Sequence, residues 1–163
     1  MDLGTTNSSV AVTKDGATFV VPGPDDTQVT RSVVSYDERG GVTVGQSAEL
    51  LSVISKASSF SSVKRLIGRR VTELDRRMYE LLPYYIMNSG ESDFAALSCP
   101  STERVLKPEE VSAEILKALK ASAERHTGEA VSEVVLSVPA YFGPGERDAT
   151  EEAARIAGLT VLR

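Results

Sequence analysis

Residues 2–8 read Asp2-Leu3-Gly4-Thr5-Thr6-Asn7-Ser8, and this segment is the most informative part of the chain. A glycine followed by hydroxyl and amide side chains predicts a tight turn between two strands. Such a turn points several backbone N–H groups into one concavity, which suits phosphate oxygens. Thr5 and Thr6 add hydroxyl donors, and Asp2 precedes the turn, where a carboxylate could hold a hydrated magnesium ion. From these residues alone, an ordinary polar hairpin remains the alternative interpretation.

Other nucleotide-binding signatures are absent from the sequence. It contains no G-x-x-x-x-G-K-[ST] segment, which excludes a P-loop protein. Gly143-Pro144-Gly145 opens like a dinucleotide-binding fingerprint, but Asp148 occupies the position of its last glycine. A phosphate site in this chain therefore has to be built around residues 2–8.

Composition sets the class of protein. The 163 residues are enough for one domain or two small subdomains, with 41% hydrophobic and 25% charged residues. A net charge of -5 gives no reason to expect nucleic acid or an anionic membrane as a partner. The single cysteine, Cys99, cannot form an internal disulfide, so we expect a reducing compartment such as the cytoplasm.

The pattern of apolar residues predicts an α/β fold. Strands are expected in the first 50 residues, and short helices at 47–55 and 60–67. A long helix should begin at Pro108 and end at Gly128, because proline favours the first helical position and glycine the position after the end. Residues 134–138 predict a strand buried on both faces, 144–157 a second helix and 159–162 a further strand. Alternating helices and strands imply a mixed or parallel sheet covered by helices.

Five segments, in order along the chain, resemble the 70-kDa heat-shock protein family. Residues 2–8 match the first phosphate-binding hairpin of that family. The other four segments are Val44-Gly45-Gln46-Ser47-Ala48, Val63-Lys64-Arg65-Leu66-Ile67-Gly68-Arg69, Val138-Pro139-Ala140-Tyr141-Phe142 and Ala154-Arg155-Ile156-Ala157-Gly158-Leu159. The matches cover nearly the whole chain.

The resemblance implies the fold and the domain organisation. It implies the actin-like, ribonuclease-H-like ATPase fold, of which residues 1–163 would form a partial N-terminal nucleotide-binding domain. Residues 1–36 and 108–163 would build the core lobe, a mixed sheet with flanking helices. Residues 37–107 would form a smaller α+β subdomain. The second phosphate hairpin and the adenosine-binding segment of the family would lie outside this chain, so we expect the 163 residues alone to be inactive.

The resemblance also assigns roles to residues. Asp2 would bind Mg²⁺ or its water shell, and Lys64 would position or polarise the water that attacks ATP. The expected nucleotide contacts, for ATP or ADP, are Gly4, Thr5, Thr6, Asn7 and Arg65. Pro139 and Arg147 match positions that relay the nucleotide state to a substrate-binding domain. For these two residues a purely structural role is an equal alternative, since Pro139 ends a strand and Arg147 begins an exposed helix.

The implied function is a molecular chaperone that couples ATP hydrolysis to binding and release of unfolded or client proteins. A J-domain co-chaperone and a nucleotide-exchange factor would be its partners. Segments such as 111–119 also resemble the HscA-like branch, which acts in iron–sulfur cluster assembly. Two alternatives remain: another actin-like phosphotransferase, of the sugar or acetate kinase type, and a truncated protein that binds a partner without hydrolysing ATP.

Departures from the family pattern lie outside the hairpin and Lys64. Arg31 stands where a proline is common, before Ser32-Val33-Val34. Residues 143–146 read Gly-Pro-Gly-Glu where the family has Asn-Asp-Ala-Gln. These differences indicate a divergent member.

Overall fold

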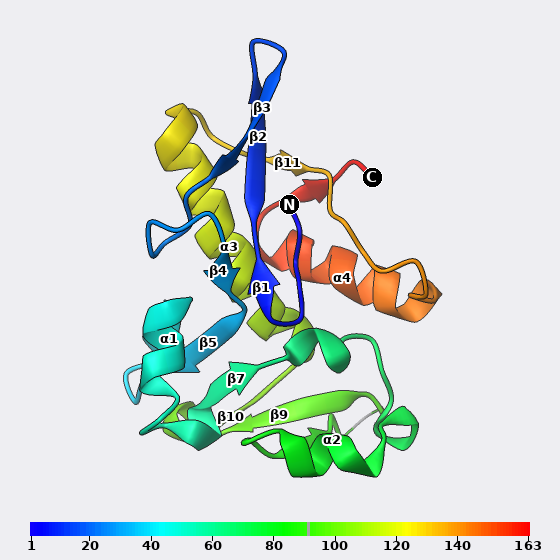
Figure 1. Ribbon diagram of the computed structural model, residues 1–163. Coiled ribbons are helices and arrows are strands. Elements are labelled where there is room, and N and C mark those ends of the chain that lie inside the picture. The colour runs from blue at the N-terminus through cyan, green and yellow to red at the C-terminus, as the bar shows by residue number, and fades with distance from the viewer. Residues whose placement is uncertain (91) are drawn as a thin grey trace.

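The computed structural model describes residues 1–90 and 92–163. Two parts are visible in the ribbon: one contains the strands at both ends of the chain with two long helices, and the other contains the middle of the chain (Figure 1). None of the helices in the described ranges is both long and apolar enough to cross a membrane.

The sheet of the first part is mixed, as the sequence predicted. The hairpin of β2 (Val10–Lys14) and β3 (Ala17–Val21) is antiparallel, with Val10 opposite Val21. Asp2 pairs antiparallel with Ser9 on one side and parallel with Ser137 on the other. Beyond Ser137, β11 (Glu133–Val134) runs parallel to β12 (Thr160–Val161). The start of the chain therefore lies between the hairpin and the C-terminal strands (Figure 1).

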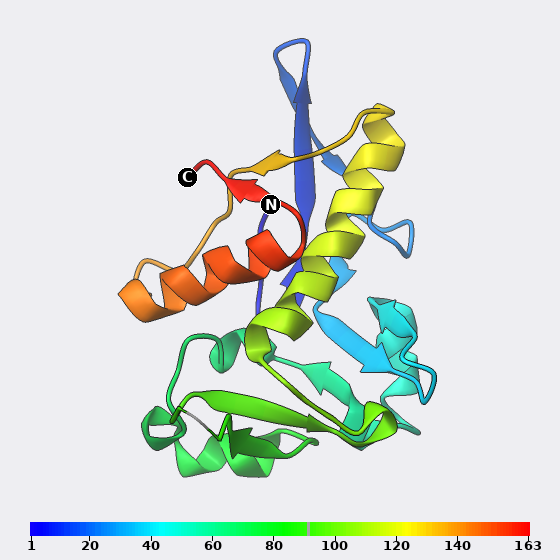
Figure 2. The ribbon, with the colours of Figure 1, turned by 180° about the vertical axis from the view of Figure 1, so that it is seen from behind.

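Two helices pack against each other on one side of these strands (Figure 2). Helix α3 (Pro108–Thr127) begins with proline, and the Glu110 carboxylate accepts the Lys107 N–H at 2.7 Å. It ends at Gly128, which adopts a left-handed conformation with φ 74°. Helix α4 spans Pro144–Ile156. Both helices were predicted within one residue of these bounds, because capping residues mark their ends.

The middle of the chain forms two small antiparallel sheets. The first has the order β6 (Val42–Val44), β5 (Val33–Tyr36), β7 (Ser59–Ser61), and the second the order β10 (Arg104–Leu106), β9 (Ala95–Cys99), β8 (Ile86–Asn88). Phe60 packs between Tyr36 and Tyr84, with ring centroids 5.9 Å and 5.0 Å apart. The helices of this part are α1 (Gln46–Leu51) and α2 (Arg76–Leu81). Earlier in the chain, β1 (Asn7–Ser8) and β4 (Thr30–Arg31) pair with each other in a separate two-stranded sheet.

Two predicted elements were wrong. Residues 60–67 do not form a helix: Phe60 pairs with Val34 in the sheet, and only Val63–Arg65 form a 3₁₀ turn. Ser62, between them, has a left-handed backbone with φ 58°, which a continuous helix excludes. Residues 134–138 are not buried on both faces, since Val135 is 57% exposed while its neighbours Val134 and Leu136 are buried. Val134 and Leu136 belong to the hydrophobic core, so the side chains of this segment alternate between core and surface.

Candidate functional site

The segment 2–8 forms the tight turn that the sequence predicted. Asp2 and Ser9 close it with two backbone hydrogen bonds of 2.9 Å and 3.0 Å. A Cβ atom on Gly4 would overlap the backbone carbonyl oxygen of Asn7, so only glycine fits there. The Gly4 N–H donates to Ser8 Oγ at 3.2 Å, and Ser8 Oγ lies 2.8 Å from Ser32 Oγ in a buried pair. The turn is therefore held from inside.

The backbone donors at the tip of this turn are available to a ligand. Among residues 1–90 and 92–163, no group accepts a hydrogen bond from the backbone N–H of Thr5 or Thr6. The Thr6 carbonyl accepts the Ser32 N–H at 2.9 Å, and this bond holds the Thr6–Asn7 peptide against the neighbouring strand segment. Two neighbouring free N–H groups suit an anionic oxygen.

Lys64 reaches the base of the turn, although 61 residues separate it from Leu3. It lies on the 3₁₀ turn Val63–Arg65, and its Nζ donates to the Leu3 carbonyl at 2.6 Å. The same Nζ lies 5.5 Å from the centroid of the Phe142 ring. Burial lowers the pKa of Lys64 below its usual value, and the nearby Asp2 carboxylate opposes that shift. A partly desolvated cation therefore lies beside the free N–H groups, where a second negative charge would stabilise it.

A pocket of about 350 Å³ opens between the turn and the Lys64 loop. Thr5, Lys64 and Arg65 contribute to its walls, so three of the predicted contacts meet in one place. Arg69 adds another positive charge, and the remaining lining residues are Met78, Tyr141 and Phe142. The prediction missed Arg69, Met78, Tyr141 and Phe142 as site residues. The available signals were the run of basic residues at 64, 65, 69 and 70 and the family-like segments 63–69 and 138–142.

Asp2 lies at the mouth of the turn, with an exposed carboxylate. Its Oδ1 accepts the Ser137 hydroxyl at 2.7 Å, which orients the side chain. No cluster of three metal-ligating side chains occurs within the described ranges of the chain. One oriented carboxylate fits a Mg²⁺ ion that keeps most of its water and binds mainly through nucleotide phosphates. It does not fit a metal held by protein ligands alone.

Within the described part of the chain, neither Pro139 nor Arg147 forms a hydrogen bond with residues 4–7. Both residues instead hold the turn that carries Phe142. The Pro139 carbonyl accepts the Phe142 N–H at 3.1 Å, and Arg147 Nε donates to the Phe142 carbonyl at 3.0 Å. Because Phe142 packs against Lys64, both residues connect with the candidate site indirectly.

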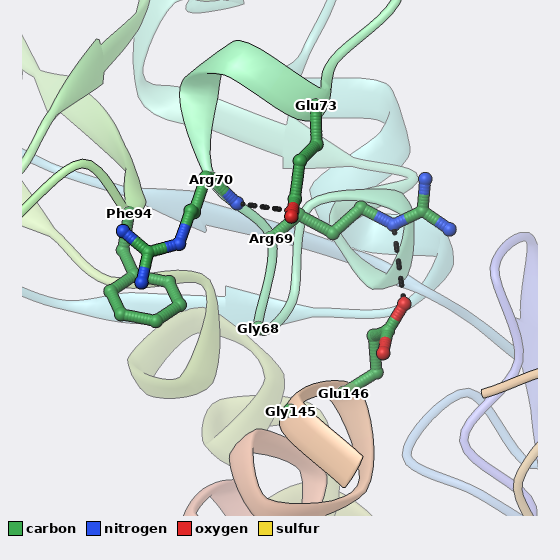
Figure 3. Close-up of a pocket in the computed structure, with 7 residues that line it drawn as sticks. All are labelled: Gly68, Arg69, Arg70, Glu73, Phe94, Gly145 and Glu146. Carbon is green, nitrogen blue, oxygen red and sulfur yellow. Dashed lines mark hydrogen bonds and ion pairs between the residues drawn. The ribbon is translucent and has the colours of Figure 1, made fainter. Parts of the chain in front are cut away.

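The loop after Lys64 rests on the first turn of α4 (Figure 3). Gly68 has φ +65°, and a Cβ atom there would lie 2.5 Å from the Gly145 carbonyl oxygen. Arg69 Nε and Glu146 Oε1 form an ion pair at 3.7 Å, and in Figure 3 these two side chains point toward each other. On the other side of the same loop, the Arg70 guanidinium stacks 5.1 Å from the Phe94 ring centroid. These contacts fix the loop that presents Lys64.

The whole chain matches one known protein family. The model of the family described as Hsp70 protein matches residues 1–163, and the chain belongs to the Hsp70 family. Its fold is therefore that family's actin-like α/β ATPase fold.

Similar proteins carry the name chaperone protein DnaK. Over all 163 residues the chain is 41% identical to the DnaK of Cyanidioschyzon merolae, 42% to that of Guillardia theta and 40% to that of Prochlorococcus marinus. It covers 26%, 26% and 25% of those proteins, so it spans about a quarter of their length.

Proposed function

We propose that residues 1–163 form the phosphate-binding side of the ATPase domain of an Hsp70-type chaperone, which binds and hydrolyses ATP. The observation that carries this proposal is the bond from Lys64 Nζ to the Leu3 carbonyl, because it joins the lysine to a turn with free N–H groups. Residues 1–36 and 108–163 would then act as the core lobe and 37–107 as the smaller subdomain. ATP and ADP are the expected ligands, with Mg²⁺.

Each residue has a role in this proposal. Gly4 allows the tight turn, and the N–H groups of Thr5 and Thr6 receive phosphate oxygens, with Asn7 beside them. Lys64 stabilises negative charge near the terminal phosphate and orients the attacking water, while Arg65 and Arg69 keep the pocket positive. These groups act by position and charge, because phosphoryl transfer requires little covalent chemistry from the protein. Mg²⁺, oriented by Asp2 through water, would supply charge neutralisation on the phosphates.

The activity of the whole protein is also part of the proposal. Hydrolysis would be coupled to binding and release of client polypeptides, with a J-domain co-chaperone and a nucleotide-exchange factor as partners. Pro139 and Arg147 would transmit the nucleotide state, since both hold the turn that carries Phe142 against Lys64. We place the protein in the cytoplasm or an equivalent reducing compartment. Nucleic acid and membranes are not expected partners.

A narrower role in iron–sulfur cluster assembly depends on the resemblance of segments such as 111–119 to the HscA-like branch. The similar proteins named above are DnaK chaperones, so the general chaperone is the proposal that they favour. Binding of an iron–sulfur scaffold protein in preference to unfolded polypeptides would identify the narrower role.

The first prediction concerns Lys64→Ala in the full-length protein. We expect single-turnover hydrolysis of ATP to fall by about 10²-fold or more, because the lysine acts on charge that develops during transfer. Binding of Mg-ATP, measured by calorimetry, should change less than tenfold, since the backbone donors of Thr5 and Thr6 remain.

Lys14→Ala is the matched control, because Lys14 is exposed on the β2–β3 hairpin away from the site. It should hydrolyse ATP at the unchanged rate. Hydrolysis by the Lys64 variant at a rate near that of the unchanged protein would rule out the proposed role. Transfer of phosphate to a sugar or acetate, rather than to water, would identify the other actin-like phosphotransferases instead.

A further inference from the structure

Arg31 connects the candidate phosphate turn to helix α1. It lies on β4 directly opposite Asn7, in a pair of strands only two residues long. Its Nη1 donates to Asn7 Oδ1 at 3.1 Å. Its Nε and Nη2 donate to the two carboxylate oxygens of Glu49, at 2.9 Å and 2.6 Å. One guanidinium therefore binds an amide on the turn and a carboxylate on α1 at once.

This geometry orients the guanidinium plane. Two parallel bonds to one carboxylate leave little rotational freedom, because both partners are planar. The third donor then has a fixed direction, toward Asn7. The Arg31 and Glu49 side chains are 40% and 42% exposed, so the ion pair contributes little to stability. The main consequence of the ion pair is that it holds the Arg31 Nη1 group next to Asn7 Oδ1.

The contact also determines which way the Asn7 amide faces. A guanidinium has donors and no acceptor, so the group that faces Arg31 must be the Asn7 carbonyl oxygen. The amide nitrogen, with two N–H donors, is then left on the other side of the group. Asn7 is exposed and directly follows the free N–H groups of Thr5 and Thr6. A donor at this position adds to a site for an anion, whereas an oxygen would repel it.

We propose that Arg31, held by Glu49, is a positioning residue that turns the Asn7 amide so that its N–H donors serve phosphate oxygens of the nucleotide. This inference rests on the proposed function. Arg31 acts on Asn7, whereas the hydrogen bond and the ring contact of Lys64 are with Leu3 and Phe142. It should therefore affect nucleotide affinity much more than the rate of hydrolysis of bound ATP.

A double-mutant cycle in the full-length protein tests this inference. Arg31→Met keeps the side-chain stem but removes the donors, and we expect the Kd for Mg-ATP to rise about three- to tenfold, the range of one hydrogen bond. Asn7→Ala should have a similar effect. In the Asn7→Ala background, Arg31→Met should raise the Kd less than twofold further, and the single-turnover rate at saturating ATP should change less than twofold. Additive effects of the two substitutions on the Kd would overturn the inference.

A second measurement does not depend on nucleotide. The hydrogen bonds of Arg31 to Asn7 and Glu49 form a clamp on a two-residue strand pair. In the nucleotide-free protein, hydrogen–deuterium exchange of residues 4–9 should be faster in Arg31→Met and in Glu49→Gln, because both substitutions weaken this clamp. Glu152→Gln is the matched control: it weakens another exposed bidentate pair, that of Glu152 with Arg155 on α4, which has two bonds of 2.6 Å. It should leave exchange at residues 4–9 unchanged.

The two measurements separate failure of the inference from failure of the proposed function. If the unchanged protein binds no Mg-ATP, the proposed function is wrong, and the role of Arg31 in nucleotide binding falls with it. If the protein binds Mg-ATP but exchange at residues 4–9 is the same in Arg31→Met and the unchanged protein, the clamp does not operate and the inference is overturned.

Discussion

Gly4 and Lys64 are the two residues that shape the candidate site. Gly4 lets the chain turn tightly, and the N–H groups of Thr5 and Thr6 have no hydrogen-bond acceptor among residues 1–90 and 92–163. Lys64 brings a cation to the same turn from a distant loop. The sequence predicted both residues, because each lies in a recognisable segment. It did not predict Leu3 or Phe142 as the contacts of Lys64, since those depend on how three separate segments pack. The role of Lys64 in hydrolysis stays a prediction.

Gly4→Ala should damage the site directly. The added Cβ would overlap the Asn7 carbonyl oxygen, and this atom belongs to the backbone and cannot rotate away. We expect the turn to open and the free energy of unfolding to fall by about 1–3 kcal/mol. The Kd for Mg-ATP should rise at least tenfold. Thermal unfolding and calorimetric titration of the full-length protein measure the two effects.

Gly145→Ala is the control for that substitution. A Cβ there would have its nearest neighbour, the Gly68 carbonyl oxygen, at an ordinary 3.5 Å. Because Gly145 lies in the first turn of α4, alanine should be neutral or should stabilise the helix by up to about 1 kcal/mol. Equal loss of stability in the two variants would show that the tight turn at Gly4 is not a special constraint.

At the scale of elements, predictability follows the strength of local signals. Helices α3 and α4 carry proline at the start and glycine near the end, and their bounds could be read from the sequence. Residues 60–67 have an apolar pattern that fits a short helix. Phe60 instead pairs with Val34 in a sheet, and its ring packs between Tyr36 and Tyr84. No local signal identifies those aromatic partners, because they lie 24 residues away on either side. Tertiary packing therefore decided an element whose local signal was weak.

Helix α3 should contribute strongly to stability through its buried face. Leu116 has no exposed surface, so Leu116→Ala should lower the free energy of unfolding by about 2–5 kcal/mol. Leu50→Ala is the same chemical change on α1, where the side chain is 69% exposed, and it should cost less than about 0.5 kcal/mol. Denaturant unfolding compares the two. Equal values would mean that α3 does not pack against the core in solution.

At the scale of the whole molecule, the arrangement joins distant parts of the chain into one site. Asp2 pairs with Ser9 and with Ser137, so the turn lies between the hairpin and the segment that leads to Phe142. The mixed sheet and its flanking helices were predicted from the alternation of elements and from the family resemblance. The position of the Lys64 loop on α4, through Gly68 and the Arg69–Glu146 pair, was not. Such contacts depend on the relative placement of segments about 77 residues apart in the sequence, as between Arg69 and Glu146.

A polypeptide of residues 1–163 alone should bind Mg-ATP poorly and should not hydrolyse it. The pocket beside Lys64 is open to water, so its donors act in a high dielectric where they are worth little. Val135 and Leu162, which directly follow the C-terminal strands β11 and β12, are 57% and 61% exposed, and we expect this edge to favour self-association. Calorimetry and sedimentation on the purified polypeptide test both statements. Micromolar binding by a verified monomer would contradict the first.

The most direct test of the account is to locate the nucleotide in the full-length protein. Mn²⁺ can replace Mg²⁺ in the complex with ATP, and its paramagnetism broadens the NMR signals of nearby amides. If phosphates bind at the turn, Mn-ATP should broaden the amide signals of Asp2, Gly4 to Asn7 and Lys64. The signals of Gly16 and Ala17, at the far end of the β2–β3 hairpin, should stay sharp. Broadening elsewhere, with residues 2–7 and Lys64 unaffected by bound Mn-ATP, would contradict the account.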